Sequence, residues 1–273
     1  MKKYLKLIRF EQWYKNILVF LPLIFANEIT HEWPMLILGF FGFSSVSAIT
    51  YIINDWLDRE KDRMHPTKKY RPLASGAIKG KQAIRIAILL AIIAGVAGWQ
   101  LGVFYTGIIA TYFIITNLYS LGLKNIPLID ITIISGNFAL RTLAGMTKWP
   151  TPSVLPYLGL LIGFIIIFIT YKRSSDIKLM GEKAAEHKPV LRFYGKKMLY
   201  AIRTLAYVLL STAFYQLLIE GLEWWKVAII LAWLIATTGF FSKYPKLAMK
   251  PHSLLKNWKW DLITLTMIFV LLI

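Results

Sequence analysis

Apolar residues occur along the chain in nine runs, each long enough to cross a bilayer as a helix. A hydrocarbon core requires about 20 consecutive, mostly apolar residues per helix. Because polar segments separate most of the runs, the pattern predicts an all-α, polytopic membrane protein. We expect a bundle of about nine transmembrane helices that forms a single transmembrane domain over residues 1–273. The runs lie at roughly 16–31, 34–54, 83–101, 103–121, 126–146, 153–171, 198–219, 224–241 and 258–273.

The composition supports a membrane protein and removes several classes of site. Hydrophobic residues make up 57% of the chain and the mean hydropathy is +0.55, whereas soluble domains average about 45–50% apolar residues. The chain contains no cysteine, which excludes disulfides, thiol nucleophiles and Zn–Cys sites. No small-residue cleavage site follows the first apolar run, so we do not expect a removable signal peptide.

The formal net charge of +18 is compatible with nucleic-acid binding and with a membrane protein that has basic cytoplasmic loops. If the N-terminus is cytoplasmic, the segments on that side carry 29 of the 32 Lys and Arg residues. This asymmetry follows the positive-inside rule, so we expect a cytoplasmic N-terminus, a C-terminus outside and no nucleic-acid partner. The cytoplasmic segments are 1–15, 55–85, 122–125, 172–203 and 242–259.

Two of the expected cytoplasmic loops, at about 55–82 and 172–197, are longer than the other connections. Long loops in a compact domain are often functional. The first begins with the pattern N-D-x-x-D-x-x-x-D, in which helical spacing places the acids on one face. Clustered carboxylates repel one another unless a cation offsets them, and Mg²⁺ binds such oxygens while bridging to phosphate. Asp55, Asp58 and Asp62 are therefore the predicted metal ligands and catalytic residues, with Asn54 beside them.

An alternative interpretation of the same motif is a solvated helix end whose acids are balanced by the interleaved bases Arg59, Lys61 and Arg63. Further bases follow, however, and Lys68 and Arg71 are suited to holding phosphate by charge-assisted hydrogen bonds. Acids that hold a metal beside bases that hold phosphate are the parts required to bind a Mg²⁺–diphosphate. His65 in the same segment is either a phosphate donor or simply an exposed side chain.

The helix plan and this motif resemble the UbiA-type intramembrane prenyltransferases. The resemblance implies a helical bundle with an aspartate-rich site on the cytoplasmic side of a prokaryotic cell membrane. Within the superfamily, three stretches are most similar to the decaprenyl-phosphate phosphoribosyltransferases, which implies phosphoribosyl pyrophosphate and a polyprenyl phosphate as substrates. They are QWYKN at 12–16, NDWLDREKDRMHPTKKYRPLASG at 54–76 and YSLGLKNIPLIDITIISGNFALRTLAG at 119–145.

The second loop departs from the pattern of prenyl-diphosphate users, which carry a second aspartate-rich motif there. Over residues 172–196 it contains a single aspartate, Asp176, and seven Lys or Arg residues, which begin with Lys172 and Arg173. This balance favours a substrate with more than one phosphate group, bound directly by bases. The alternative is that these bases only contact anionic lipid.

Two ionisable residues, Asp130 and Arg141, lie in the fifth apolar run. They are 11 residues apart, which is about 16 Å along a helix, so they cannot pair directly. Arg141 therefore requires a partner on another helix or a bound anion. The predicted substrate-binding residues are Lys15, Asn54, Lys68, Arg71, Tyr119, Lys124, Arg141, Lys172, Arg173 and Asp176.

The predicted reaction is Mg²⁺-dependent transfer of 5-phosphoribosyl from phosphoribosyl pyrophosphate to a polyprenyl phosphate, with release of diphosphate. One alternative is transfer of a polyprenyl group from its diphosphate to an aromatic or lipid acceptor, which uses the same metal motif. An alternative from another class is a transporter of phospholipids or isoprenoid phosphates, since intramembrane charges also mark transport pathways.

Overall fold

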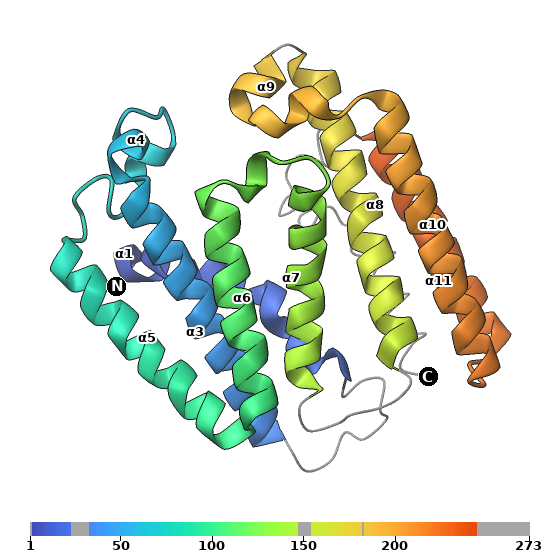
Figure 1. The fold of residues 1–273 in the computed structure, drawn as a ribbon, viewed down its shortest axis with the longest axis horizontal. Coiled ribbons are helices and arrows are strands. Elements are labelled where there is room, and N and C mark those ends of the chain that lie inside the picture. Colours follow the sequence, from blue (N-terminus) through green and yellow to red (C-terminus); the bar gives the residue numbers. More distant parts are fainter. Residues whose placement is uncertain (1, 23–32, 147–153, 182, 245–273) are drawn as a thin grey trace. The chain divides into compact units, whose positions relative to one another are not determined.

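The computed structural model describes residues 2–22, 33–146, 154–181 and 183–244, and within these ranges the chain is helical with no β-strand (Figure 1). The helices form two compact units. The first comprises residues 1–122 and 137–151, and the second comprises residues 123–136 and 152–273. Helix α7 contributes its second half to the first unit and its first half to the second. The expectation of a single transmembrane domain stays a prediction.

The first unit is built on two long antiparallel helices, α3 and α5, which pack side by side (Figure 1). A turn at Gly102, where φ is +93°, joins α5 directly to α6, and only glycine adopts this conformation without strain. The elements are α1 (Lys2–Leu7), η1 (Phe10–Phe20), α3 (Trp33–Leu57), α4 (Arg59–Arg63), η2 (Lys68–Tyr70), α5 (Gly80–Leu101), α6 (Val103–Leu121) and α7 (Ile129–Gly145).

Close packing of α3 on α5 and α6 depends on a small residue. At Gly42, a Cβ atom would lie 2.5 Å from Cβ of Ala97 and 2.6 Å from the hydroxyl oxygen of Tyr105. The Tyr105 side chain is fully buried, and its hydroxyl donates to the carbonyl of Gly39 at 2.6 Å. Small residues at such crossings allow helix backbones to approach one another, which is how membrane helices gain packing contacts.

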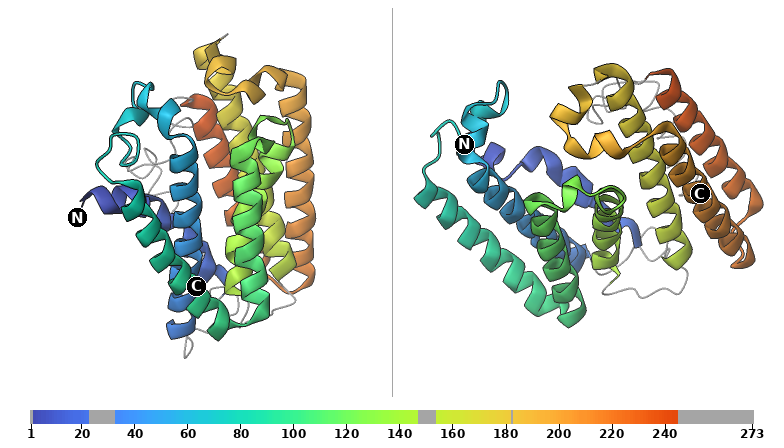
Figure 2. Two further views of the ribbon diagram at one scale, coloured as in Figure 1. Left: turned by 60° about the vertical axis from the view of Figure 1, so that its left-hand side comes forward. Right: turned by 45° about the horizontal axis from the view of Figure 1, so that its top comes forward.

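The second unit has α8 and α10 as its framework, and the two lie side by side in both views of Figure 2. Its core brings Ile167 of α8 together with Leu210 and Phe214 of α10 and Leu234 of α11. The elements of this unit are η3 (Leu123–Asn125), the start of α7, α8 (Val154–Met180), α9 (Lys183–His187), η4 (Pro189–Phe193), α10 (Lys196–Ile219) and α11 (Trp224–Lys243).

Five described helices are long and apolar enough to span a membrane: α3, α5, α6, α8 and α10. Helix α11 contains a shorter apolar stretch, Trp224–Phe240. The first predicted run begins within the 3-10 helix η1 and extends beyond the described residues. The last predicted run, 258–273, lies entirely outside the described residues. The predicted number of about nine helices therefore stays a prediction.

The predicted start of the second loop at residue 172 was wrong, because α8 continues to Met180. The hydropathy pattern marks where a segment becomes too polar for hydrocarbon, whereas a helix ends where its backbone hydrogen bonds end. Here Arg173, Ser175 and Asp176 are buried on the extended part of the helix, so packing carries α8 beyond its apolar run.

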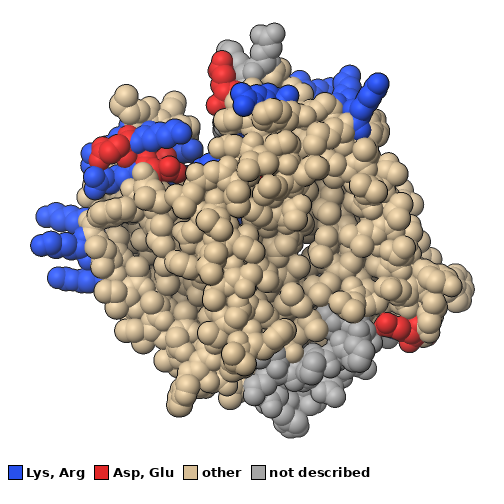
Figure 3. All heavy atoms as spheres, viewed as in Figure 1, with Lys and Arg blue, Asp and Glu red and all other residues tan. Residues whose placement is uncertain are grey.

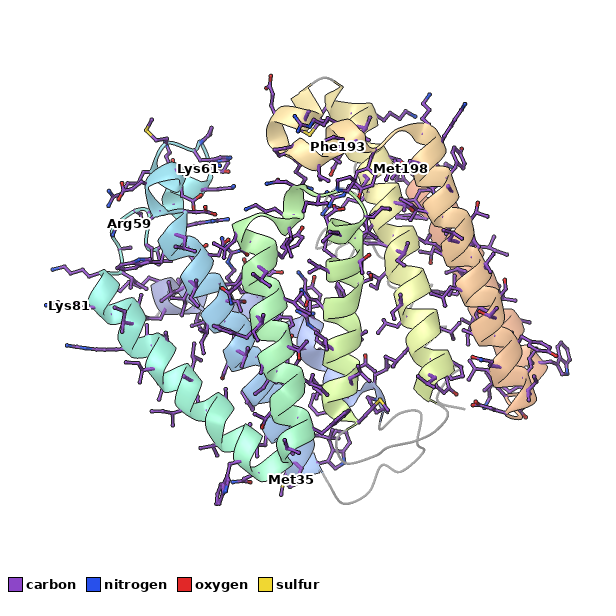
Figure 4. All side chains as sticks on the ribbon, viewed as in Figure 1. Met35, Arg59, Lys61, Lys81, Phe193 and Met198 are labelled. Carbon is purple, nitrogen blue, oxygen red and sulfur yellow. The ribbon has the colours of Figure 1, made fainter. Side chains whose placement is uncertain are left out.

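In the first unit, the charged side chains gather at one end of the helices. Figure 3 shows Lys, Arg, Asp and Glu together around α4 and basic side chains at the start of α5, with an uncharged surface over the rest of α5 and over α6. Figure 4 places Arg59 and Lys61 at this end of α3 and Met35 at its other end, while Lys81 projects from the start of α5. Large apolar side chains of α5 such as Ile88 are exposed, as expected for a face in contact with lipid.

Candidate active site

The predicted aspartates lie where α3 gives way to α4. The helix is interrupted at Asp58, yet the amide of Asp58 donates to the carbonyl of Asn54 at 2.9 Å and the amide of Asp62 donates to that of Asp58 at 2.8 Å. These bonds keep the four-residue helical spacing through the break. Asp55 and Asp62 are each only 2% exposed, whereas Asp58 is half-buried.

Arg71 joins the two buried aspartates. Its Nη1 lies 3.1 Å from Oδ1 of Asp55 and 2.7 Å from Oδ2 of Asp62. Arg71 follows η2 in an extended conformation, with φ −64° and ψ 143°. Pro72 accounts for this, because a residue that precedes proline is driven out of the helical region. The Arg-Pro sequence therefore ends η2 and directs the arginine back onto the acids.

Arg9 is a residue of this site that the sequence analysis missed. Its Nη2 lies 2.7 Å from Oδ1 of Asp55, and its guanidinium lies 4.5 Å from the ring centroid of Tyr51. The backbone of Arg9 is left-handed, with φ 48° and ψ 48°, which costs about 1–3 kcal/mol in a non-glycine residue. The sequence feature that could have indicated Arg9 is its position as a single cation between the apolar pair Leu7–Ile8 and the apolar residue Phe10.

Asp55 and Asp62 are thus matched by two guanidinium groups, so the cluster of Arg9, Asp55, Asp62 and Arg71 is formally neutral. Asp58 has no ion pair within the described part of the chain. No group of three or more His, Asp or Glu side chains close enough to hold a metal ion was found among the described residues. The structure therefore brings together two of the three predicted metal ligands, and a metal role for all three stays a prediction.

In an ordinary charged helix end, the interleaved bases would balance the predicted aspartates. Two of these bases instead pair with another acid. Arg59 and Arg63 both contact Glu60, at 2.8 and 2.7 Å. The hydrogen bond from Arg59 lowers the pKa of the exposed Glu60 carboxyl. The described ion pairs of Asp55 and Asp62 come from Arg9 and Arg71 instead, which lie outside α4.

His65 and Lys68 lie in the turn that follows α4. The backbone amides of Thr67 and Lys68 both donate to Nδ1 of His65 at 3.2 Å. Through these bonds His65 closes the turn that leads to Arg71. The half-buried side chains of Asn54 and Lys68 lie in the same segment, and their substrate contacts stay predictions.

Arg141 is the centre of a second polar cluster in the first unit. It is buried and donates from Nε to Oδ1 of Asn16 at 2.9 Å, from Nη1 to the carbonyl of Asn137, and from Nη2 to the hydroxyl of Tyr112 at 3.1 Å. Its guanidinium also lies 5.5 Å from the ring of Phe43. The partner on another helix that its burial requires is therefore neutral, and η1, α6 and α7 are joined through it.

In the second unit, Asp130 is a fully buried acid. Its Oδ2 accepts from Nη2 of Arg173 at 2.6 Å, and its Oδ1 accepts from the hydroxyl of Tyr194. The Tyr194 oxygen in turn accepts the amide of Leu128 at 3.0 Å. Burial raises the pKa of Tyr194, and the bond to Asp130 adds to this. Arg173, predicted to contact substrate, is thus engaged by a buried carboxylate, and its substrate role stays a prediction.

The remaining predicted substrate-binding residues are divided between the two units. In the second unit, Asp176 is paired with Lys188 at 3.2 Å, while Lys124 and Lys172 are half-buried. In the first unit, Lys15 lies 5.9 Å from the ring centroid of Tyr14, and Tyr119 is half-buried near the end of α6. Each unit therefore contains part of the predicted set, and the substrate contacts of these residues stay predictions.

The chain is similar to one known family of membrane enzymes. The model of the UbiA prenyltransferase family matches residues 16–260. Decaprenyl-phosphate phosphoribosyltransferase of Mycolicibacterium smegmatis is 31% identical over 209 residues, covering 74% of this chain and 65% of that protein. The protein of the same name from Corynebacterium glutamicum is 30% identical over 216 residues, covering 74% and 63%. The chain thus spans just under two thirds of the length of these relatives.

Solved structures give the same fold. A UbiA homologue from Archaeoglobus fulgidus bound to GPP and Mg²⁺ has a TM-score of 0.70 and 21% identity, with 98% of each chain covered. A structure described as digeranylgeranylglyceryl phosphate synthase in membranes has a TM-score of 0.74 and 22% identity, covering 99% of this chain and 96% of that one. The predicted all-α, UbiA-like fold is confirmed.

Proposed function

Since the chain belongs to the UbiA prenyltransferase family, and is therefore an integral membrane transferase, we propose that it transfers 5-phosphoribosyl from phosphoribosyl pyrophosphate to a polyprenyl phosphate. Diphosphate is the leaving group. The names of the two relatives support this choice of substrates. The proposed location is the cell membrane, with the N-terminus and the loops at about 55–82 and 172–197 on the cytoplasmic side.

The observation that carries the choice of donor is the state of Asp176. It is the only aspartate of residues 172–197, and it is already paired with Lys188. A prenyl-diphosphate site with two acidic motifs requires a second group of metal-binding carboxylates. A single aspartate that is already paired does not supply such a group. Basic residues dominate the segment instead, and they suit the 5-phosphate of the donor or the phosphate of the acceptor lipid.

The acids of the first segment fit Mg²⁺ by their chemistry. The oxygens of Asp55 and Asp62 converge on one cationic nitrogen of Arg71, and Mg²⁺ prefers oxygen ligands of this kind. Asp55 and Asp62 would hold the ion, with Asp58 as a third ligand from the same turn. When bound, Mg²⁺ acts as a Lewis acid that stabilises the charge of the diphosphate leaving group.

The protein side chains then bind and orient the two reactants. Lys68 and Arg71 of the first unit hold donor phosphates, and Lys172 of the second unit is proposed separately as a phosphate-binding residue. The bond between C1 of the ribose and the diphosphate oxygen breaks, and a phosphate oxygen of the lipid forms the new bond to C1. The attacking oxygen is already anionic, so no general base is required. Holding both reactants in line supplies much of the rate acceleration.

Purified full-length protein with Mg²⁺ tests this proposal in two parallel assays. One offers labelled phosphoribosyl pyrophosphate with polyprenyl phosphate, and the other offers a polyprenyl diphosphate with aromatic or lipid acceptors. We expect a labelled lipid in the first assay. Product in the second assay alone would replace the proposal with prenyl transfer. Turnover of neither donor, together with lipid-phosphate flux in liposomes, would favour a transporter.

A further inference from the structure

In the described structure, the positive charge between the carboxylates of Asp55 and Asp62 is supplied by a side chain of the protein, Arg71. A single nitrogen, Nη1 of Arg71, contacts one oxygen of each carboxylate. Both aspartate side chains are almost fully buried, so their charges interact in a medium that screens poorly. A buried acid pair of this kind requires a cation between its oxygens, and Arg71 occupies that position.

Adding a metal to this arrangement creates a charge problem. The cluster with Arg9 and Arg71 is formally neutral, and counting Asp58 as a third ligand makes it −1, so a divalent ion that entered alone would still leave at least one excess positive charge beside two guanidinium groups. Like charges at such short range are strongly unfavourable in a partly buried site. The metal gains both carboxylates only if a guanidinium leaves them, and an incoming diphosphate offers that guanidinium a new anionic partner.

We infer that Arg71 is an internal counter-ion that competes with Mg²⁺ for Asp55 and Asp62, and that it transfers to the diphosphate when metal and diphosphate bind together. The inference rests on the proposed metal site of this function. Arg71 is better placed for the exchange than Arg9, because Arg71 contacts both acids whereas Arg9 contacts Asp55 alone. The ring of Tyr51 also packs against the Arg9 guanidinium.

The exchange predicts a binding signature that does not depend on turnover. We would measure Mn²⁺ affinity of the purified full chain by electron paramagnetic resonance, with inorganic pyrophosphate as the diphosphate probe. In the wild type, pyrophosphate should tighten Mn²⁺ binding by about tenfold or more. In Arg71→Gln, Mn²⁺ alone should bind about tenfold more tightly than in the wild type, and pyrophosphate should tighten it less.

Two further variants separate competition from other effects. Lys69→Gln removes the same charge from an exposed neighbour and should leave Mn²⁺ affinity within about twofold of the wild type. Arg71→Lys keeps the charge and should bind Mn²⁺ alone as weakly as the wild type. Unchanged or weaker Mn²⁺ binding in Arg71→Gln would mean that Arg71 positions the acids rather than competing with the metal, and would overturn the inference.

The wild-type measurement can overturn the inference even if Arg71→Gln does not fold. If pyrophosphate leaves the Mn²⁺ affinity of the wild type unchanged, the coupled exchange is wrong. The result is also independent of the donor, because phosphoribosyl pyrophosphate and prenyl diphosphates share the diphosphate group. Failure of phosphoribosyl transfer would therefore leave this inference standing, and loss of the coupling would leave the choice of donor open to the turnover assays.

Discussion

Arg173 and Asp130 form a buried ion pair, in which Nη2 of the arginine lies 2.6 Å from Oδ2 of the aspartate. The side chains are 6% and 0% exposed. The pair joins the start of α7 to the polar end of α8, and Tyr194 adds the segment after η4 by donating to the same carboxylate. Arg173 therefore pairs with a buried carboxylate, a role that its position in a basic segment did not indicate.

Breaking this pair should destabilise the protein strongly. Asp130→Asn or Arg173→Gln leaves one buried charge without its partner, which typically costs about 3–5 kcal/mol of unfolding free energy. The double variant should lose much less than the sum of the two single losses, because neither charge then remains. Unfolding in detergent, followed by circular dichroism for all four proteins, measures the coupling.

The pair of Lys226 with Glu223, at 3.3 Å, is a matched control, because the glutamate is exposed. Lys226→Gln should cost no more than about 1 kcal/mol, as exposed pairs contribute little. Equal losses for Lys226→Gln and Arg173→Gln would show that burial of the Asp130 pair has no energetic consequence.

Tyr194 should make stability fall at high pH. Its pKa is raised in the folded state by burial and by the bond to Asp130, whereas an unfolded tyrosine titrates near 10. The contribution is therefore fully present below about pH 10 and is lost as the pH rises above it, since the unfolded state releases its proton first. Denaturant unfolding between pH 8 and 11 should show a shallower decline in Tyr194→Phe than in the wild type. Parallel declines in both proteins would contradict this origin.

Variants of two of the predicted metal ligands, Asp58 and Asp62, should separate stability from metal binding. Asp62→Asn removes a buried partner of Arg71, so it should lower both thermal stability and turnover. Asp58→Asn changes a half-buried side chain, so its unfolding free energy should remain within about 0.5 kcal/mol of the wild type. If Asp58 is a metal ligand, turnover should nevertheless fall by about 100-fold, or 2.7 kcal/mol. Normal turnover in Asp58→Asn would remove it from the metal site.

Gly42 and Gly95 provide a matched test of helix packing in the first unit. A Cβ atom at Gly42 would lie 2.5 Å from Cβ of Ala97, whereas at Gly95 nothing lies within 4 Å. Gly42→Ala should therefore cost about 1–3 kcal/mol through overpacking. Gly95→Ala should be neutral or gain up to about 1 kcal/mol from helix propensity. Thermal unfolding of the two variants compares them directly, and equal stabilities would contradict the close approach of α3 and α5.

The absence of native cysteine allows a clean test of membrane orientation. Lys61→Cys and Glu220→Cys each introduce one thiol at an exposed position. The charge asymmetry predicts that Lys61 faces the cytoplasm and Glu220 the outside. An impermeant maleimide added to intact cells should label the Cys at 220 and not that at 61, and inverted membrane vesicles should give the opposite result. Labelling of both positions from one side would refute the predicted topology.

Much of the helical plan is readable from the chain because the bilayer imposes a length and a polarity on each span. The acidic cluster is readable for a similarly local reason. Helical spacing places Asn54, Asp58 and Asp62 on one face, and the hydrogen bonds of the structure keep that spacing across the break at Asp58. The Arg-Pro step that directs Arg71 toward the acids is also a local effect.

The ion pairs could not be read in this way. Arg9 contacts Asp55 from 46 residues away, and Arg141 contacts Asn16 from 125 residues away. Local patterns specify which side of a helix is polar, but they do not specify which distant helix packs against it. The sequence by itself determined an all-helical membrane protein with an acidic motif, because those properties depend on hydropathy and spacing along one segment, and its resemblance to a known family implied a transferase. Only the tertiary structure decided that Arg9 and Arg71 neutralise that motif, because buried charges take their partners from whichever helices the packing brings near.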